Sequence, residues 1–161
     1  MPDRVDTNAQ ALTAFAGNYV SGEGEQKLEY VVSPDGSELR VLPGNPVSFS
    51  YMHSTRDVDP ERCERLSNRI AERVAAYVEK DDLLPLFDAY GGSAPLEVLE
   101  QGWAARKQRQ QEQYGALVGF SILGTAMRDG RDVTLVRHEF EFGHADTAFV
   151  WDPEMEEHLL G

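Results

Sequence analysis

Residues 114–152 read YGALVGFSILGTAMRDGRDVTLVRHEFEFGHADTAFVWD, and this stretch decides the fold. Two long apolar runs flank the segment 128–131, and a third, shorter run ends in Trp151. Asp129 and Gly130 between apolar runs are typical of a tight β-hairpin, because both residue types tolerate the positive φ angles of such turns. The pattern predicts three consecutive antiparallel strands over residues 117–125, 133–142 and 147–151.

Side chains of the second expected strand alternate between two faces of the sheet. One face is apolar around a single histidine and carries Thr134, Val136, His138, Phe140 and Phe142. The opposite face becomes charged halfway along and carries Val133, Leu135, Arg137, Glu139 and Glu141. Glu139 and Glu141 share their face with Arg137, so they are expected to form a solvated cross-strand charge ladder and not a catalytic acid pair.

The composition excludes several classes of partner. The 161 residues carry a formal net charge of -13, which repels nucleic acid and anionic membrane surfaces. High acid content with little lysine resembles the usage of salt-adapted organisms, and an ordinary acidic protein is the alternative. No apolar run approaches the roughly 18 residues of a membrane span. The polar N-terminus is unlike a signal peptide, so a cytoplasmic location is expected unless the chain was excised from a longer secreted protein.

The first third of the chain is expected to form a small β meander over residues 10–55, after a flexible polar segment over residues 1–9. Short strands are predicted at 18–21, 28–32, 39–42 and 47–52, with turns at 34–36 and 43–46 where proline and glycine fit the required φ angles. A sheet of so few short strands has marginal stability alone in water. We therefore expect the meander to pack on another part of the protein.

The middle of the chain predicts three helices. Asp59 and Pro60 are a good N-cap and first helical residue, and apolar residues then recur at helical spacing over 60–80. A short helix follows over 83–90. A third helix is expected after a cap at Ser93, with a buried stripe of Leu96, Leu99 and Trp103 and a solvated polar tail over 106–113. Residues 153–161 are expected to be an acidic tail.

This order of elements predicts an α+β fold, with helices segregated from antiparallel strands. Three helices followed by long curved strands, over residues 60–152, resemble the cone-shaped fold of cystatins and nuclear-transport-factor-like proteins. The resemblance implies three helices packed on a curved antiparallel sheet, with a pocket at the wide end.

The N-terminal part carries a second resemblance. The sequence FAGNY at 15–19, the strand-like segment at 28–32, the SPDG turn at 33–36 and the strand at 39–42 are similar to the small β domain that follows the catalytic domain of β-lactamase-like serine hydrolases. The resemblance implies an accessory region that accompanies a hydrolase. The chain has no S-x-x-K motif, so the nucleophile of that family is absent and its activity is not carried over.

His138 is the leading candidate for chemistry, because a titratable group in a dry cleft can act as an acid or a base. The alternative is a core histidine with a satisfied hydrogen bond. Aromatic residues near it could fill the core or stack on a ligand, and Asp88 and Tyr90 could reach a pocket mouth or lie on the helix surface. The candidate pocket residues are His138, Phe140, Trp151, Trp103, Tyr90 and Asp88.

No motif for a cofactor or a nucleotide is present in the sequence, and none is expected to bind. His138 and His144 could begin a zinc site, but no third ligand can be placed, so no metal is expected. Cys63 is the single cysteine, so an intrachain disulfide is excluded, and its place on the buried helix stripe is typical of an inert thiol.

Two functions remain open from the sequence. The first is a non-catalytic accessory or interaction domain, with a homodimer or a separate hydrolase as the expected partner. The second is a small-molecule binding protein or enzyme whose pocket lies on the His138 face of the sheet.

Overall fold

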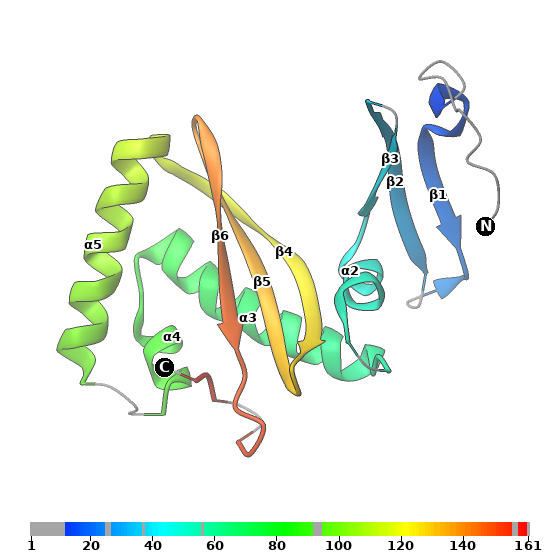
Figure 1. The fold of residues 1–161 in the computed structure, drawn as a ribbon. Coiled ribbons are helices and arrows are strands. Elements are labelled where there is room, and N and C mark those ends of the chain that lie inside the picture. The colour runs from blue at the N-terminus through cyan, green and yellow to red at the C-terminus, as the bar shows by residue number, and fades with distance from the viewer. Residues whose placement is uncertain are drawn as a thin grey trace.

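A computed structural model describes residues 12–24, 27–36, 38–55, 57–91, 95–155 and 158–160. Within these residues the protein is α+β and contains two three-stranded antiparallel sheets, as Figure 1 shows. The first sheet lies to one side of the second, and a short helix, α2, lies between them. The expected flexible segment over residues 1–9 and the expected cap Ser93 lie outside the described residues. No helix of the described residues is long and apolar enough to cross a membrane.

The second sheet confirms the three strands expected from the C-terminal stretch. Its strands pair in chain order and are β4 (Leu117–Arg128), β5 (Arg131–Phe140) and β6 (Gly143–Val150). The β4–β5 turn is made by Asp129 and Gly130, with φ angles of 52° and 79°. These are the positive angles that a tight hairpin requires.

The second turn of this sheet differs from the expectation. Phe142 was expected on the apolar face, but β5 ends at Phe140 and the Phe142 side chain is 82% exposed. The strand ends there because the chain must reverse before β6 begins at Gly143, and the register pairs Phe140 with Gly143. Alternation along a strand therefore stops being informative at the turn itself.

Helix α3 (Pro60–Lys80) has the bounds predicted for it and crosses one face of the second sheet (Figure 1). The Asp59 side chain caps it by accepting a hydrogen bond from the Arg62 backbone N–H at 3.0 Å. The helix ends at Asp81, which adopts a left-handed conformation. Its apolar stripe packs on the sheet in a core that includes Leu66, Ile70, Val74, Leu86, Val136, Phe149 and Trp151.

The two later helices cover less of the sheet than expected. Helix α4 (Leu84–Ala89) is short, and α5 (Leu96–Tyr114) lies beside the β6 edge of the sheet (Figure 1). None of the α5 side chains is fully buried, and Leu96 is 44% exposed. The expected buried stripe is therefore wrong at Leu96, while Leu99 and Trp103 are half-buried. A helix beside a sheet edge buries a narrower stripe than a helix that lies across the sheet face.

The first sheet consists of β1 (Gly17–Ser21), β2 (Leu28–Asp35) and β3 (Glu38–Pro43), paired in chain order. Three of the strands predicted in the first third of the chain are thereby confirmed. Pro34 and Asp35 belong to β2 and not to the turn, where Gly36 has a φ of 63°. No residue of these three strands is fully buried.

The strand predicted at residues 47–52 is wrong, because these residues form helix α2 (Pro46–His53). Asn45 caps the helix by accepting a hydrogen bond from the Ser48 backbone N–H at 2.8 Å, and Pro46 occupies the first helical position. The cap at Asn45 and the proline after it therefore start a helix where a strand was predicted.

Two serines of α2 connect the two sheets. The Ser48 hydroxyl accepts a hydrogen bond from the Glu29 backbone N–H of β2 at 2.6 Å. The Ser50 hydroxyl donates to the Thr125 carbonyl of β4 at 2.5 Å. Both serines are buried, so these bonds satisfy groups that water does not reach.

Among the described residues after β6, Leu159 packs in the core. Leu159 is 3% exposed, pairs with Trp151 in an isolated bridge and donates its backbone N–H to the Ala89 carbonyl at 2.6 Å. Leu159 thus ties this segment to α4 and to the end of the sheet, and the Leu160 backbone N–H donates to the Val150 carbonyl of β6 at 2.8 Å.

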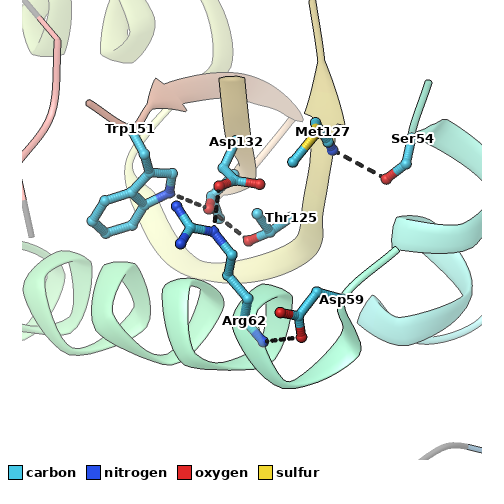
Figure 2. Close-up of polar contacts among 8 residues, drawn as sticks. Ser54, Asp59, Arg62, Thr125, Met127, Asp132 and Trp151 are labelled. Carbon is cyan, nitrogen blue, oxygen red and sulfur yellow. Dashed lines mark hydrogen bonds and ion pairs between the residues drawn. The ribbon is translucent and has the colours of Figure 1, made fainter. Parts of the chain in front are cut away.

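A chain of buried hydroxyls lies between the second sheet and the N-terminal half of α3, as Figure 2 shows in part. The Trp151 Nε1–H donates to the Thr134 hydroxyl at 2.8 Å, and Thr134 contacts the Thr125 hydroxyl at 2.7 Å. Thr125 in turn contacts the Ser67 hydroxyl of α3 at 2.8 Å. Nearby, the Arg62 side chain donates to the buried carboxylate of Asp132 at 2.7 Å. These bonds join the sheet to α3 beneath its apolar stripe.

Candidate functional site

A pocket of about 290 Å³ lies between α5 and β6. This volume is at the lower end of the range of roughly 300–1,000 Å³ that is typical of ligand pockets. Both apolar and polar side chains form its wall. The lining residues are Tyr90, Val98, Leu99, Gly102, Trp103, Arg106, Thr147 and Ala148.

Arg106 supplies the charge in this pocket. Its Nη2 donates to the Thr147 hydroxyl at 2.5 Å, and its guanidinium carbon lies 5.7 Å from the centre of the Trp103 ring. Burial is the main cause that lowers the pKa of the guanidinium, and no carboxylate is among the groups that act on it. An arginine keeps its charge in proteins, so the pocket holds a partly dehydrated cation.

His138 lies behind Thr147 and is 3% exposed. Its Nδ1 is 3.3 Å from the Thr147 hydroxyl, and its Nε2 is buried without a hydrogen-bond partner in the described residues. Burial, with a smaller contribution from the charge of Arg106, lowers the pKa of His138 to about 4. The imidazole is therefore neutral at pH 7, and Arg106 is the charged group of the pair.

Thr147 is the junction between these two side chains. Its hydroxyl accepts from Arg106, and its own proton can then be donated to His138 Nδ1. This direction uses the donor of the buried hydroxyl and one of its two acceptor sites. Thr147 thereby fixes the position of the Arg106 guanidinium at the pocket wall.

Trp103 forms a rigid aromatic side of the pocket. Its ring stacks on Phe149 with centroids 6.5 Å apart and an interplanar angle of 20°. Its edge meets Tyr77 with centroids 5.5 Å apart and an angle of 70°. The indole is held by core residues, so it is positioned before any ligand arrives.

Gly102 leaves open space in the wall of the pocket. A Cβ atom built at this position would meet no atom within 4 Å. Glycine inside a helix costs roughly 0.5–1 kcal/mol relative to alanine. Packing against the described residues does not require glycine at this position, so the helix bears this cost while the pocket gains room.

The structure places the other candidate residues from the sequence in different surroundings. Tyr90 and Trp103 line the pocket, and His138 lies one layer behind it. Phe140 lies beside Tyr114 at a ring distance of 5.8 Å, away from the pocket lining. Trp151 is 1% exposed and belongs to the core, and Asp88 is exposed and does not line the pocket.

Six of the eight lining residues are not among the candidates from the sequence, and two of these six, Arg106 and Thr147, are hydrogen-bonded to each other. Arg106 was assigned to a solvated polar tail. Its spacing held a usable signal, because Leu99, Trp103 and Arg106 stand at positions i, i+4 and i+7 and so share one helix face. For Thr147 the sequence holds no such signal, because its role depends on how α5 docks beside β6.

The first sheet presents a second candidate surface. Its register places residues of β1, β2 and β3 in rows across one face. No described residue of that face is acidic or basic, and Tyr19, Leu39 and Val41 on it are 46%, 37% and 44% exposed. The face consists of Gly17, Tyr19, Ser21, Leu28, Tyr30, Val32, Pro34, Leu39, Val41 and Pro43. We call it the uncharged face.

Cys63 borders a different pocket of about 190 Å³ between α2, α3 and β4. Burial raises the pKa of the thiol, so Cys63 is protonated at neutral pH and is a poor nucleophile. Among the described residues, no cluster of three potential metal ligands is present.

Comparison of the chain with protein-family models, with curated proteins and with solved structures finds no match.

Proposed function

We propose that this chain is a non-catalytic interaction module that associates with a second copy of itself through the uncharged face of the first sheet. The observation that carries the proposal is the absence of acidic and basic side chains from that face within the described strands. The core of a protein interface is typically depleted in charged residues in the same way.

The uncharged face contrasts with the rest of the molecule. Charged residues make up 27% of the chain, and its net charge is -13. The opposite face of the same sheet also exposes aliphatic side chains, Val20, Val31 and Leu42, but it differs in carrying the charged residues Glu29, Asp35, Glu38 and Arg40. A surface that is free of charge on such an acidic molecule favours contact with an apolar partner surface.

Stability of the sheet supports the same conclusion. A sheet of three short strands needs a covered face for independent stability. Within the described residues, α2 and its cap are bonded to the first sheet at Lys27 and Glu29, where β2 begins. The 3-10 turn Thr13–Phe15 also contacts β2, and the Phe15 carbonyl accepts from the Tyr19 hydroxyl at 2.8 Å, but most residues of the strands remain partly exposed. A second sheet stacked on the uncharged face would give each copy the missing layer.

A second copy suits this face because the face complements itself. In a two-fold symmetric dimer, the same patch on each copy meets its equivalent, so no charge would be buried without a partner. The two acidic molecules repel each other at low salt. Screening shortens the Debye length from about 10 Å at 0.1 M salt to about 3 Å at 1 M, so salt strengthens the dimer.

The test measures the molar mass in solution across concentration and salt, by light scattering after size-exclusion chromatography and by sedimentation velocity. The variant Val41→Glu places a charge on the uncharged face. The matched control is Val31→Glu, which makes the same change on the opposite face, at a residue that is 41% exposed compared with 44% for Val41.

We expect the unmodified chain and the Val31→Glu control to dimerise, more strongly in high salt, while Val41→Glu stays monomeric. A monomer at millimolar concentration in 1 M salt would refute the homodimer. The remaining form of the proposal would then be a different protein partner, such as the hydrolase that the sequence resemblance implies.

A further inference from the structure

We propose that the pocket between α5 and β6 binds a small organic monocarboxylate, with the carboxylate on Arg106 and an apolar or aromatic body against Trp103. This site is independent of the dimer proposed above, because it lies on the second sheet and α5, whereas the uncharged face belongs to the first sheet.

The charge of Arg106 is available to a ligand. A guanidinium offers five N–H donors, and in the described residues one of them is used, on Thr147. Other basic residues of the chain have carboxylate partners: the next residue of the helix, Lys107, pairs with Asp81 at 2.5 Å, and Arg137 pairs with Asp146 at 2.9 Å. Arg106 has no such partner among the described residues, in a chain with 28 acidic residues. The guanidinium of Arg106 therefore has free N–H donors that can bind the anionic group of a ligand.

The Arg106 guanidinium is oriented before a ligand binds. Thr147 and Trp103 both hold Arg106 in place. The Thr147 hydroxyl oxygen is 2.5 Å from Arg106 Nη2, and the centre of the Trp103 ring is 5.7 Å from the guanidinium carbon. Thr147 is itself braced by the buried, neutral ring of His138. A guanidinium that is fixed in advance loses less freedom when it binds a planar carboxylate through two parallel hydrogen bonds.

The apolar wall of the pocket suits the body of an organic ligand. Val98, Leu99 and Trp103 supply apolar wall, and Gly102 leaves space between them and the cation. An inorganic anion would use none of these apolar surfaces. A ligand with several negative charges would be repelled by the net charge of -13, and the pocket holds one arginine to offset it. The site therefore favours a single carboxylate on an apolar body.

The experiment uses the full chain and benzoate as the probe. Binding is measured by isothermal titration calorimetry and by the change in tryptophan fluorescence, since Trp103 lies in the pocket wall. Benzamide, which has the same shape without the charge, and inorganic phosphate, which has charge without an apolar body, are titrated in parallel. We expect benzoate to bind about tenfold or more tightly than either one, as the loss of a charged hydrogen bond predicts.

Three variants assign the binding to the pocket. Arg106→Gln is expected to weaken benzoate binding by about tenfold or more. Its matched control is Arg109→Gln, which removes the same charge from an exposed position of the same helix and should leave the affinity nearly unchanged. Gly102→Leu fills the open space and should abolish binding without lowering the melting temperature, because leucine favours the helix more than glycine does.

The proposal would be overturned by no benzoate binding at millimolar concentration, by equal affinity for benzoate and benzamide, or by equal losses in Arg106→Gln and Arg109→Gln. Tight binding of phosphate without benzoate binding would replace the carboxylate by an inorganic anion and would also refute it. None of these results changes the molar mass, so a failure here is distinct from a failure of the dimer.

Discussion

The Arg106 guanidinium and the Thr147 hydroxyl form a 2.5 Å hydrogen bond that joins the middle of α5 to β6, 41 residues further along the chain. Trp103, which stacks on Phe149, and Tyr114, which lies beside Phe140, also contact this sheet, but none of the α5 side chains is fully buried. The bond therefore both orients the cation of the pocket and fixes the helix that carries it.

A double-mutant cycle measures this bond in the free energy of unfolding. Thr147→Val removes the hydroxyl with little change in shape, and Arg106→Met removes the guanidinium. We expect each single variant to lose about 1–2 kcal/mol, and the double variant to lose less than the sum by about 1 kcal/mol. Urea unfolding followed by circular dichroism gives these values. Strict additivity would show that the two side chains do not cooperate.

The buried ring of His138 predicts a pH dependence of stability. Its pKa is about 4 in the folded chain and about 6.5 when unfolded, so the unfolded chain binds more protons between these values. Stability contributed by the neutral ring is complete above pH 6.5 and is lost as the pH falls towards 4, by about 3 kcal/mol in total.

This pH dependence is measured by urea unfolding between pH 4 and pH 7 and by NMR titration of the imidazole. Compared with the unmodified chain, His138→Gln should lose less stability over this interval. The exposed His144→Gln variant is the control for removing one imidazole. An NMR titration midpoint near 6.5 for His138 would contradict the buried environment.

Thr134 is predicted to be the most sensitive hydroxyl of the buried chain under α3. It accepts from Trp151 Nε1 and contacts Thr125, and its side chain has no exposed surface. Thr134→Val keeps the shape but leaves the indole N–H without its acceptor, at an expected cost of about 2–3 kcal/mol.

Thr134→Ser provides the complementary variant, because it keeps the hydroxyl and removes one methyl group, at an expected cost of about 1 kcal/mol. Chemical unfolding, followed by the tryptophan emission of the chain, reports both changes. If Thr134→Val were as stable as the unmodified chain, the hydroxyl chain would make no net contribution to stability.

Local signals in the sequence predicted the parts of the fold that local interactions decide. Asp59 and Pro60 start α3, and Asp129 and Gly130 make the hairpin, because each set of residues satisfies nearby backbone groups whatever lies further away. The position of α5 beside the edge of β6 depends on distant contacts. For that reason the exposure of Leu96 and the role of Arg106 were not predictable from periodicity alone.

In the candidate site, too, local sequence signals predicted some features, while others depend on distant contacts. The apolar alternation of β5 indicated that His138 faces inwards, and the structure buries it. That Thr147 separates His138 from the pocket depends on the pairing of β5 with β6, which the sequence did not specify residue by residue.

The alternating sequence VSFSYM, at residues 47–52, has a further consequence once it is read as a helix. Residues two apart in a strand point to the same side, whereas in a helix they are about 200° apart and point to opposite sides. Ser48 and Ser50 can therefore reach β2 and β4 at the same time. Helix α2 therefore links the two sheets through one serine on each of its sides, so a rotation of one sheet would also move the other.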